Sequence, residues 1–221
     1  MKNYILKKTN RKTVALLINK DGGLIVKAPF NVSEKEIEEI ITRKRRWIEE
    51  KQKLINDRKK LYREHHFLQG EEFLYLGNKY FLKYSNNVKS IIIKEDIMYI
   101  SSSIKDKKSA IITWYKKAAL YFLKERVSYY EKITGVKIKS IKITSARRQW
   151  GSCGREGNIN FSWRLIMCPV EAIDYVILHE IIHILHPNHS KFFYSCLEQY
   201  MPDYKNFKQW LVDNQQIMDI I

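Results

Sequence analysis

The sequence predicts an α+β fold, with a small N-terminal β-rich domain that has one long helix, followed by a C-terminal domain built around longer helices. Short apolar runs separated by turn residues fill most of the first hundred positions. A long helical pattern then replaces them, so we expect domains at residues 1–103 and 104–221. Of the 221 residues 45% are hydrophobic, which is enough for one sizeable core or two small ones.

The first strands are expected within residues 12–28, on either side of a turn at Asp21-Gly22-Gly23. This turn sequence supplies the positive φ angles that a tight hairpin requires. Asn31 or Ser33 then caps the long helix, which continues to Arg63 as a polar, basic stretch.

The remaining elements follow from the same pattern rules. Residues 73–82 hold the hairpin signal Gly77-Asn78 between two aromatic-rich runs, and residues 90–101 add further strands. In the C-terminal domain we expect a helix over 111–133, strands over 136–144 and 158–165, a helix over 170–185, and helices from Ser190 and Tyr204.

The chain is strongly basic, with 40 lysine and arginine side chains against 24 aspartate and glutamate side chains and a net charge of +16. Residues 1–70 carry 18 of the basic and 9 of the acidic groups, so the excess leans toward the N-terminus. Such a balance attracts phosphate-bearing partners, which leaves a nucleic-acid partner open.

The sequence does not predict contact with a membrane. No apolar run approaches the roughly 18–20 residues that a spanning helix requires. The N-terminal residues are basic but lack the apolar stretch of a secretory signal. Three widely spaced cysteines without a C-x-x-C pair indicate reduced thiols. We therefore expect a cytoplasmic protein.

Four of the six histidines lie in the segment from position 179 to position 189. On a helix, residues four apart share a face, so His179 and His183 can present ring nitrogens to one metal ion. Glu180 flanks that site, where its carboxylate can take a proton from a water that the metal has made more acidic. The spacing is that of the H-E-x-x-H motif of zinc enzymes.

A catalytic zinc requires three protein ligands and one open position, so the helical pair needs a third side chain. We expect His189 to supply it, because Pro187 ends the helix and lets the chain turn back toward the pair. His186 is the competitor. It follows His183 by three residues on the same helical surface and would point along the helix.

Apart from Asp174, the helix that carries the motif is otherwise apolar between Ile173 and Leu185. Histidine and glutamate side chains buried there without partners would each cost free energy on the scale of kcal/mol. A bound metal removes that cost, so the sequence predicts a metal site rather than unrelated histidines.

Several further segments carry a family resemblance. They are Arg11-Lys12-Thr13, residues 26–29 and 73–77, Trp150-Gly151-Ser152-Cys153, residues 158–166 and 174–183, Asn188-His189-Ser190, and residues 202–205. Together they resemble the YgjP-like metallopeptidase domain family, which is related to SprT-like and other zincins, over nearly the whole chain.

The resemblance implies a zincin-like metallopeptidase domain in which His179, His183 and His189 hold Zn²⁺ and Glu180 is the general base. It also implies a peptide or protein substrate. These expectations agree with the interpretation of the residues themselves.

Two residues depart from the family's pattern. Gln149 stands where a basic residue precedes the tryptophan in the family, and Ser162 stands where the family often has asparagine. Neither is an expected metal ligand, so both bear only on contacts near the cleft.

Supporting residues are expected around the metal. The oxyanion of a hydrolysis transition state needs a donor, for which His186 and Tyr194 are the nearest candidates in sequence. Asp203, or else Asp174, can accept a hydrogen bond from the far nitrogen of a ligand histidine. The strand over 158–165 either pairs with an extended peptide substrate or pairs only within its own sheet.

Two other functions compete with a peptidase. A zinc-dependent phosphate-ester or nucleotide hydrolase would bind anions with the arginines near position 147. A nucleic-acid-binding module would use the basic helix over 43–63, with a structural zinc. A structural zinc normally has four protein ligands, and three good ones are present. We therefore predict a zinc-dependent hydrolase, and within that class a metallopeptidase.

Overall fold

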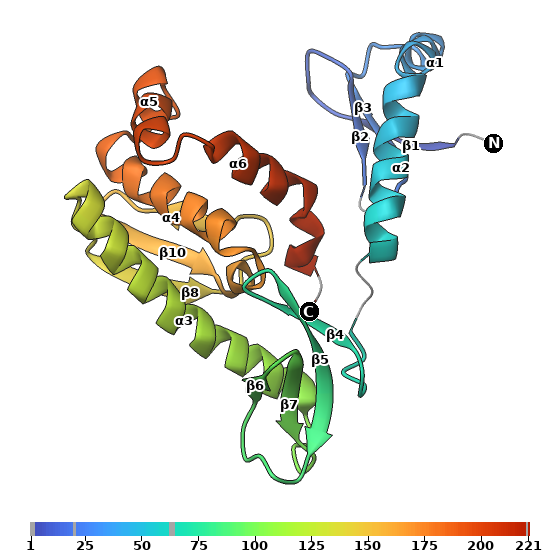
Figure 1. Ribbon diagram of the computed structural model, residues 1–221. Helices are drawn as coiled ribbons and strands as arrows, with labels where there is room; N and C mark the ends of the chain where they lie inside the picture. Colours follow the sequence, from blue (N-terminus) through green and yellow to red (C-terminus); the bar gives the residue numbers. More distant parts are fainter. Residues whose placement is uncertain (1–2, 20, 62–64, 220) are drawn as a thin grey trace. The chain divides into compact units, whose positions relative to one another are not determined.

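The structure, a computed structural model, describes residues 3–19, 21–61, 65–219 and 221 (Figure 1). The chain forms two compact units, Met1–Arg63 and Glu64–Ile221. Helices and strands occur in both units, which confirms the predicted α+β class. Within the described residues, no helix has both the length and the apolar character needed to cross a bilayer.

The first unit contains a three-stranded sheet with strand order β1-β3-β2. β1 (Tyr4–Lys8) runs parallel to β3 (Leu24–Ala28), and β2 (Ala15–Ile18) runs antiparallel to β3. The Asn19 side-chain oxygen accepts a hydrogen bond from the Gly23 N–H at 2.7 Å, which closes the turn between β2 and β3. The sequence predicts these two strands but not β1, whose partner lies twenty residues away.

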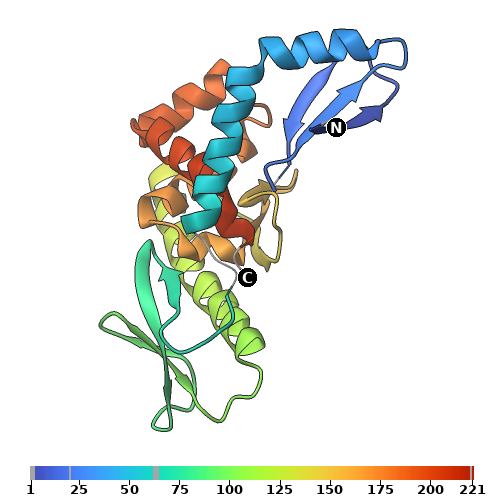
Figure 2. The same ribbon diagram turned by 90° about the vertical axis from the view of Figure 1, so that its right-hand side faces the viewer.

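Two helices follow the sheet, where the sequence predicts one. α1 (Glu34–Arg43) begins at Ser33, whose hydroxyl accepts a hydrogen bond from the Glu36 N–H while the Glu36 carboxylate accepts one from the Ser33 N–H. α2 (Arg45–Leu61) runs in a different direction after Lys44 (Figure 2). Of the two predicted caps, Ser33 is therefore the N-cap.

The size of the sheet explains the break between α1 and α2. An unbroken helix over residues 34–61 would be about 42 Å long, at about 1.5 Å per residue. A five-residue strand spans only about 17 Å. The turn at Lys44 keeps both Ile37 and Ile48 in the core of the first unit. Arg63, the last residue of the predicted helix, lies outside the described residues.

The second unit begins with a four-stranded sheet in the order β4-β5-β7-β6. Its strands are β4 (Glu72–Tyr75), β5 (Asn78–Ser85), β6 (Ile92–Lys94) and β7 (Ile97–Ser101). Leu76 and Gly77 form the turn between β4 and β5, with φ angles of 49° and 80°. The hairpin predicted from Gly77-Asn78 is therefore present, one residue earlier than the signal suggests.

This sheet belongs with the C-terminal elements, so the observed division after residue 63 differs from the expected boundary after residue 103. The N–H groups of Leu76 and Gly77 donate to the carbonyl oxygens of Ile166 and Met167, at 2.8 and 3.3 Å. A Cβ atom on Gly77 would lie 2.9 Å from the Cα atom of Pro169. The hairpin thus holds the segment that leads into the H-E-x-x-H helix.

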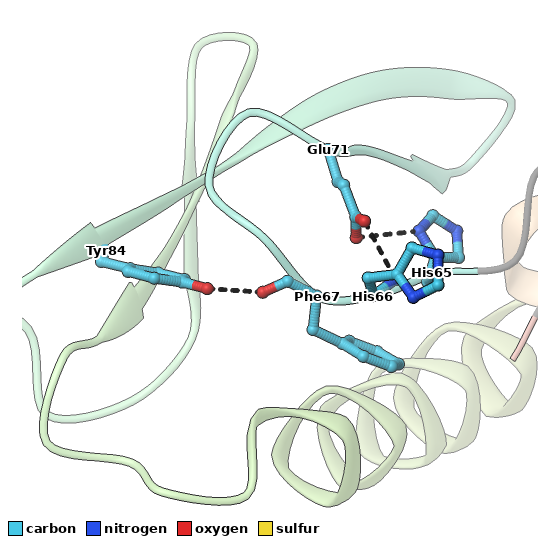
Figure 3. A network of polar contacts seen from close by, with 5 residues as sticks. All are labelled: His65, His66, Phe67, Glu71 and Tyr84. Atoms are coloured by element: carbon cyan, nitrogen blue, oxygen red, sulfur yellow. Dashed lines mark hydrogen bonds and ion pairs between the residues drawn. The ribbon is translucent and has the colours of Figure 1, made fainter.

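A polar network precedes β4 in the second unit (Figure 3). Glu71 accepts a hydrogen bond from the His66 N–H at 2.9 Å, and its other carboxylate oxygen lies 3.6 Å from Nδ1 of His65. The His65 ring stacks on Phe73 with ring centroids 4.1 Å apart. Burial lowers the pKa of His65, although the carboxylate of Glu71 acts in the opposite direction.

The remaining elements of the second unit surround its other sheet, which has the strand order β8-β10-β9. They are α3 (Lys107–Thr134), β8 (Ser140–Thr144), β9 (Gly151–Cys153), β10 (Asn158–Ser162), the 3₁₀ helix η1 (Trp163–Met167), α4 (Val170–Leu185), α5 (Lys191–Tyr200), α6 (Tyr204–Asp213) and the 3₁₀ helix η2 (Gln215–Asp219). α3 packs against β8, α4 packs against β9, and the two helices contact each other (Figure 1). Ile159 and Phe161 of β10 are fully buried.

Candidate metal centre

α4 carries the H-E-x-x-H motif, and its bounds match the helix predicted over residues 170–185. The apolar side chains along it are largely buried, which fixes the rotation of the helix. His179 and His183 lie one turn apart, and their Nε2 atoms are 3.2 Å apart. Both rings therefore project from one face of the helix, as their spacing predicts.

His189 joins this pair from outside the helix. α4 ends at Leu185 with His186 as its C-cap, and the chain turns through Pro187 so that Nε2 of His189 lies 3.0 Å from Nε2 of His179. The ligand atoms of the three histidines all lie within 4.8 Å of one another. His186 contributes its backbone instead, because its carbonyl oxygen lies 3.2 Å from Nδ1 of His183.

The spacing of the three nitrogens fits a single metal ion. Two ligands at about 2.0–2.1 Å from a tetrahedral zinc ion are about 3.4 Å apart. Burial is the largest of the causes that lower the pKa of His179 to about 3, and the charges of His183, His189 and Lys208 contribute to the same shift. The pKa of His189 is also lowered, first by burial and then by the charges of His183 and Lys208. Lowered pKa values favour the neutral imidazole, which is the form that binds metal.

A phenylalanine ring supports the three histidines. The centroid of the Phe193 ring is 4.9 Å from that of His179, 4.7 Å from that of His183 and 4.9 Å from that of His189. The side chain is fully buried. Ser190 begins α5 by accepting a hydrogen bond from the Phe193 N–H, so the turn that returns His189 also places Phe193. The sequence does not single out Phe193, whose signal is its position three residues after a capping serine.

Glu180 is buried, with 5% of its surface exposed. Its carboxylate accepts a hydrogen bond from the Cys153 N–H, while Oε2 has no partner among the described residues. Burial raises the pKa of Glu180 to about 7, although the bond from Cys153 acts in the opposite direction. A carboxyl group with that pKa can take up and release a proton near neutral pH.

Gly151 on β9 faces the side chain of Glu180. A Cβ atom at position 151 would lie 2.8 Å from both Cγ and Oε1 of Glu180, closer than real contacts allow. Glycine is therefore needed at this point for the strand to approach the carboxyl group. In the sequence, this segment is visible only through the family resemblance.

The structure contradicts one of the two predicted carboxylate partners. Oδ1 of Asp174 accepts a hydrogen bond from Nε of Arg126 at 2.8 Å, so this carboxylate forms an ion pair rather than contacting a histidine. Asp203 precedes α6 and forms no side-chain capping bond. Nδ1 of His179 is buried and has no hydrogen-bond partner in the part of the chain that the structure describes.

Of the two candidate oxyanion donors, Tyr194 has its ring against the histidine cluster. It stacks on His189 with ring centroids 6.1 Å apart and on Tyr204 with centroids 5.9 Å apart. His186 contacts the cluster through its backbone, because its carbonyl oxygen lies 3.2 Å from Nδ1 of His183. The donor role of Tyr194 stays a prediction.

The strand predicted to pair with a peptide substrate is the middle strand of its sheet. β10 pairs with β8 along one edge and with β9 along the other, so it has no free edge. β9 pairs with β10 alone among the described strands. Because Trp150 and Gly154 bond to β10, the alternation of an antiparallel ladder turns the backbone groups of Gly151 and Cys153 outward. β9 therefore has a free edge, and so does β8 on the opposite side of the sheet.

The two departures from the family pattern have ordinary structural settings. The Ser162 hydroxyl donates a hydrogen bond to the Ala146 carbonyl oxygen at 2.8 Å and begins η1. Gln149 lines a hollow of about 230 Å³ on the polar face of the β8-β10-β9 sheet. The other side chains there are small or polar and include Lys142, Thr144, Ser152 and Asn160.

A motif helix with two histidines one turn apart, a third histidine returning from the following loop and a buried glutamate between them defines a metallopeptidase-type site. Comparison with known families agrees with this class. The YgjP-like metallopeptidase domain family matches residues 12–214, so the chain belongs to that family and is a peptidase whose substrates are proteins or peptides. The resemblance predicted from the sequence motifs is confirmed.

No curated protein matches the sequence. Solved structures match parts of the chain at low TM-scores. The crystal structure of the metallopeptidase zymogen abylysin from Pyrococcus abyssi is 17% identical, with a TM-score of 0.39, and the match covers 42% of this chain and 95% of that one. The crystal structure of a Wss1 mutant from Saccharomyces cerevisiae is 22% identical, with a TM-score of 0.35, and the match covers 49% of this chain and 88% of that one.

Proposed function

We propose that this chain is a zinc-dependent peptidase in which His179, His183 and His189 are the metal ligands and Glu180 is the general base. The observation that carries the proposal is the convergence of the three imidazole groups, with ligand atoms within 4.8 Å of one another. The buried Glu180 follows His179 directly on the same helix. Three nitrogen ligands leave a tetrahedral ion one open position, which is the requirement of a catalytic rather than a structural site.

Zinc suits this donor set, because imidazole nitrogen is among its preferred ligands and four-coordinate geometry is its usual one. When bound, the ion would polarise the scissile carbonyl group and make an attacking water molecule more acidic. His183 is oriented for this role by the carbonyl oxygen of His186, which selects the tautomer with its lone pair on Nε2.

Glu180 provides the proton transfers. Its unpartnered Oε2 takes a proton from the attacking water as the new carbon–oxygen bond forms. The same oxygen then gives the proton to the amide nitrogen as the carbon–nitrogen bond breaks, so the carboxylate ends the cycle as it began. A pKa of about 7 suits both directions of transfer at neutral pH.

The free edge of β9 provides a place for an extended substrate. Gly151 turns backbone groups outward, and a peptide strand can pair with them by strand addition. The Cys153 N–H is already bound to Glu180, so peptide pairing at this strand would lie next to the general base. Strand addition forms hydrogen bonds with the backbone of a substrate. A peptide has such a backbone and a phosphate ester does not, so this mode of binding agrees with a peptidase.

The competing functions gain no support from the arginines on which they depend. Arg147, expected to bind a phosphate ester, donates from Nη2 to the backbone oxygen of Ile221 at 3.0 Å. On α2, Arg45 and Arg46 form i,i+4 ion pairs with Glu49 and Glu50, which reduces the charge that this stretch offers to a phosphate backbone.

Substitution of Glu180 tests the proposal. We expect Glu180→Gln to bind zinc like the wild type but to lose about 10²–10⁴-fold in peptide hydrolysis, because the amide cannot accept a proton from water. The measurement is cleavage of a synthetic peptide mixture by zinc-loaded protein, with zinc content determined in parallel. Glu171→Gln is the matched control, since Glu171 is an exposed residue in the first turn of the same helix.

Two results would count against the proposal. Wild-type rates in Glu180→Gln would remove Glu180 as the base. Absence of cleavage by the zinc-loaded wild type, over a peptide mixture covering all residue types, would remove the peptidase activity itself.

A further inference from the structure

Lys208 lies beside the histidine cluster without a role in the chemistry described so far. It is an exposed residue on α6, and its Nζ atom is 5.3 Å from the centroid of the Tyr194 ring. The same tyrosine ring stacks on His189. Lys208 therefore contacts the residue that contacts the expected third ligand.

The ring of Tyr194 connects Lys208 to the cluster, because it lies under the Lys208 ammonium group and stacks on His189. No ion pair joins Lys208 to a carboxylate among the residues that the structure describes. Lys205 on the same helix differs, because its Nζ atom lies 3.6 Å from a carboxylate oxygen of Glu198.

An unpaired ammonium group beside a cation site is unfavourable for the cation, since like charges repel. The same arrangement is favourable for an anion that lies between the two positive charges. Glu180 does not fill that role, because its carboxyl group is buried against β9 and bonded to Cys153. A carboxylate on a bound substrate would lie favourably between the ammonium group and the metal ion.

We propose that Lys208 is a specificity-determining residue that binds a carboxylate of the substrate, so that the enzyme prefers peptides with a carboxylate near the scissile bond. This inference rests on the proposed peptidase function. The carboxylate comes either from an aspartate or glutamate side chain or from the C-terminus of a short peptide. Both sources present the same charge and the same acceptor oxygens to the ammonium group.

Lys208 does not stabilise the oxyanion in this account. An oxyanion donor must lie about 2.7–3.1 Å from the developing charge, next to the metal. Lys208 is instead placed against Tyr194, which itself stacks on His189. That position suits a group one or more residues away from the bond that is cleaved.

The test compares matched peptides that differ only in charge. One set replaces glutamate by glutamine at each position around the cleaved bond, and a second set replaces a free C-terminal carboxylate by an amide. We expect zinc-loaded wild type to prefer the carboxylate form in one set by about tenfold in kcat/KM, the size of a charge-assisted contact. In Lys208→Gln we expect equal kcat/KM values for the charged and uncharged peptides, whereas Lys208→Arg should retain most of the preference.

Lys205→Gln is the matched control. Lys205 also lies over a tyrosine ring, at 5.6 Å from the Tyr204 centroid, but it is paired with Glu198. We expect this variant to keep the wild-type preference, since the loss should follow the position of the charge and not the total charge of α6.

A binding measurement makes the test independent of turnover. Zinc-loaded Glu180→Gln should bind the fluorescently labelled carboxylate peptide about tenfold more tightly than its uncharged partner, and the additional change Lys208→Gln should remove this difference. The zinc affinity of Lys208→Gln should rise, because a repelling charge is lost.

Two results would overturn the inference. One is equal binding of charged and uncharged peptides by Glu180→Gln. The other is a loss of kcat/KM in Lys208→Gln that is the same for every peptide, which would place the lysine in the transition state instead. Either result with active wild-type enzyme leaves the proposed peptidase in place, whereas a wild type without peptide hydrolysis contradicts the peptidase and not the carboxylate contact.

Discussion

The side chain of Glu180 lies where a side chain at position 151 would have to be, so it depends on the glycine there. The carboxyl group lies between α4 and β9, where burial raises its pKa to about 7. Its position therefore depends on the absence of a side chain on the strand opposite. A family motif identifies this glycine in the sequence, but the contact that requires it is seen only in the structure.

Gly151→Ala should lower kcat by at least about tenfold, because the methyl group would displace the carboxyl group of Glu180 from its place, and small misplacements of catalytic groups are costly. Zinc content should stay at the wild-type level, since the atoms nearest to the new Cβ all belong to Glu180 and not to a histidine. The measurement is kcat together with zinc content. Gly154→Ala is the matched control, because its new Cβ atom would meet its nearest neighbour at an ordinary 3.5 Å. Equal activity of both variants would show that the contact does not position the base.

Phe193 is the second residue whose role follows from packing. Phe193→Ala should destabilise the metal-free protein by about 3–5 kcal/mol, the usual cost of removing a fully buried phenylalanine. It should also weaken zinc binding, because the ring contacts all three imidazoles. Urea unfolding and zinc titration measure the two effects.

Phe192→Ala provides the comparison for Phe193, since the neighbouring ring is 76% exposed. We expect its stability to stay within about 0.5 kcal/mol of the wild type. If Phe193→Ala bound zinc as tightly as Phe192→Ala, the supporting role of the buried ring would be wrong.

The residues of the site divide by the kind of signal they leave in the sequence. His179, Glu180 and His183 follow from helical spacing, and the structure brings His189 to them as the proline break predicts. Phe193 could not be predicted in this way, because an aromatic residue at a helix start has many possible neighbours. The partner of His183 is a backbone carbonyl oxygen, which every residue has, so no residue type reveals it.

Among the elements, α4 and β9 position the site, and the hairpin between β4 and β5 holds the start of α4. The predicted bounds of α4 are accurate, because a long apolar helix has a strong periodic signal. The break between α1 and α2 could not be predicted from local sequence, since it depends on the width of the sheet beneath. The same applies to β9, whose free edge depends on which strand takes the central place.

The segment before β4 gives a prediction about pH. Burial lowers the pKa of His65 below its usual 6.5, so the unfolded chain takes up a proton at a higher pH than the folded protein does. This histidine therefore contributes stability above pH 6.5, and the contribution is lost as the pH falls through its lower, folded-state value.

His65→Phe should make the free energy of unfolding less sensitive to acid than in the wild type, because the ring stack on Phe73 is retained and the titrating group is removed. Urea unfolding of both proteins at a series of pH values between about 7.5 and about 5 isolates the effect as a difference, since the other histidines are common to both. A difference that stays constant over this range would refute the assigned shift.

At the scale of the whole molecule, the chain has two units, of which the second carries every residue of the proposed site. The strands of the first and second units have the same short, turn-separated pattern, so the pattern cannot assign them to one unit or the other. The assignment comes from long-range bonds such as those between Leu76 and Ile166, which local sequence does not encode. The α+β class follows from the pattern, while the division into units follows from the contacts.

The central claim is that three histidines of the second unit hold one catalytic zinc ion. The most direct test is zinc stoichiometry and X-ray absorption at the zinc edge for the wild type and His189→Ala. We predict one zinc ion per wild-type chain with three imidazole ligands and one open position, and a variant with greatly weakened zinc binding. Unchanged zinc binding by His189→Ala, or a wild-type spectrum with four protein ligands, would contradict the claim.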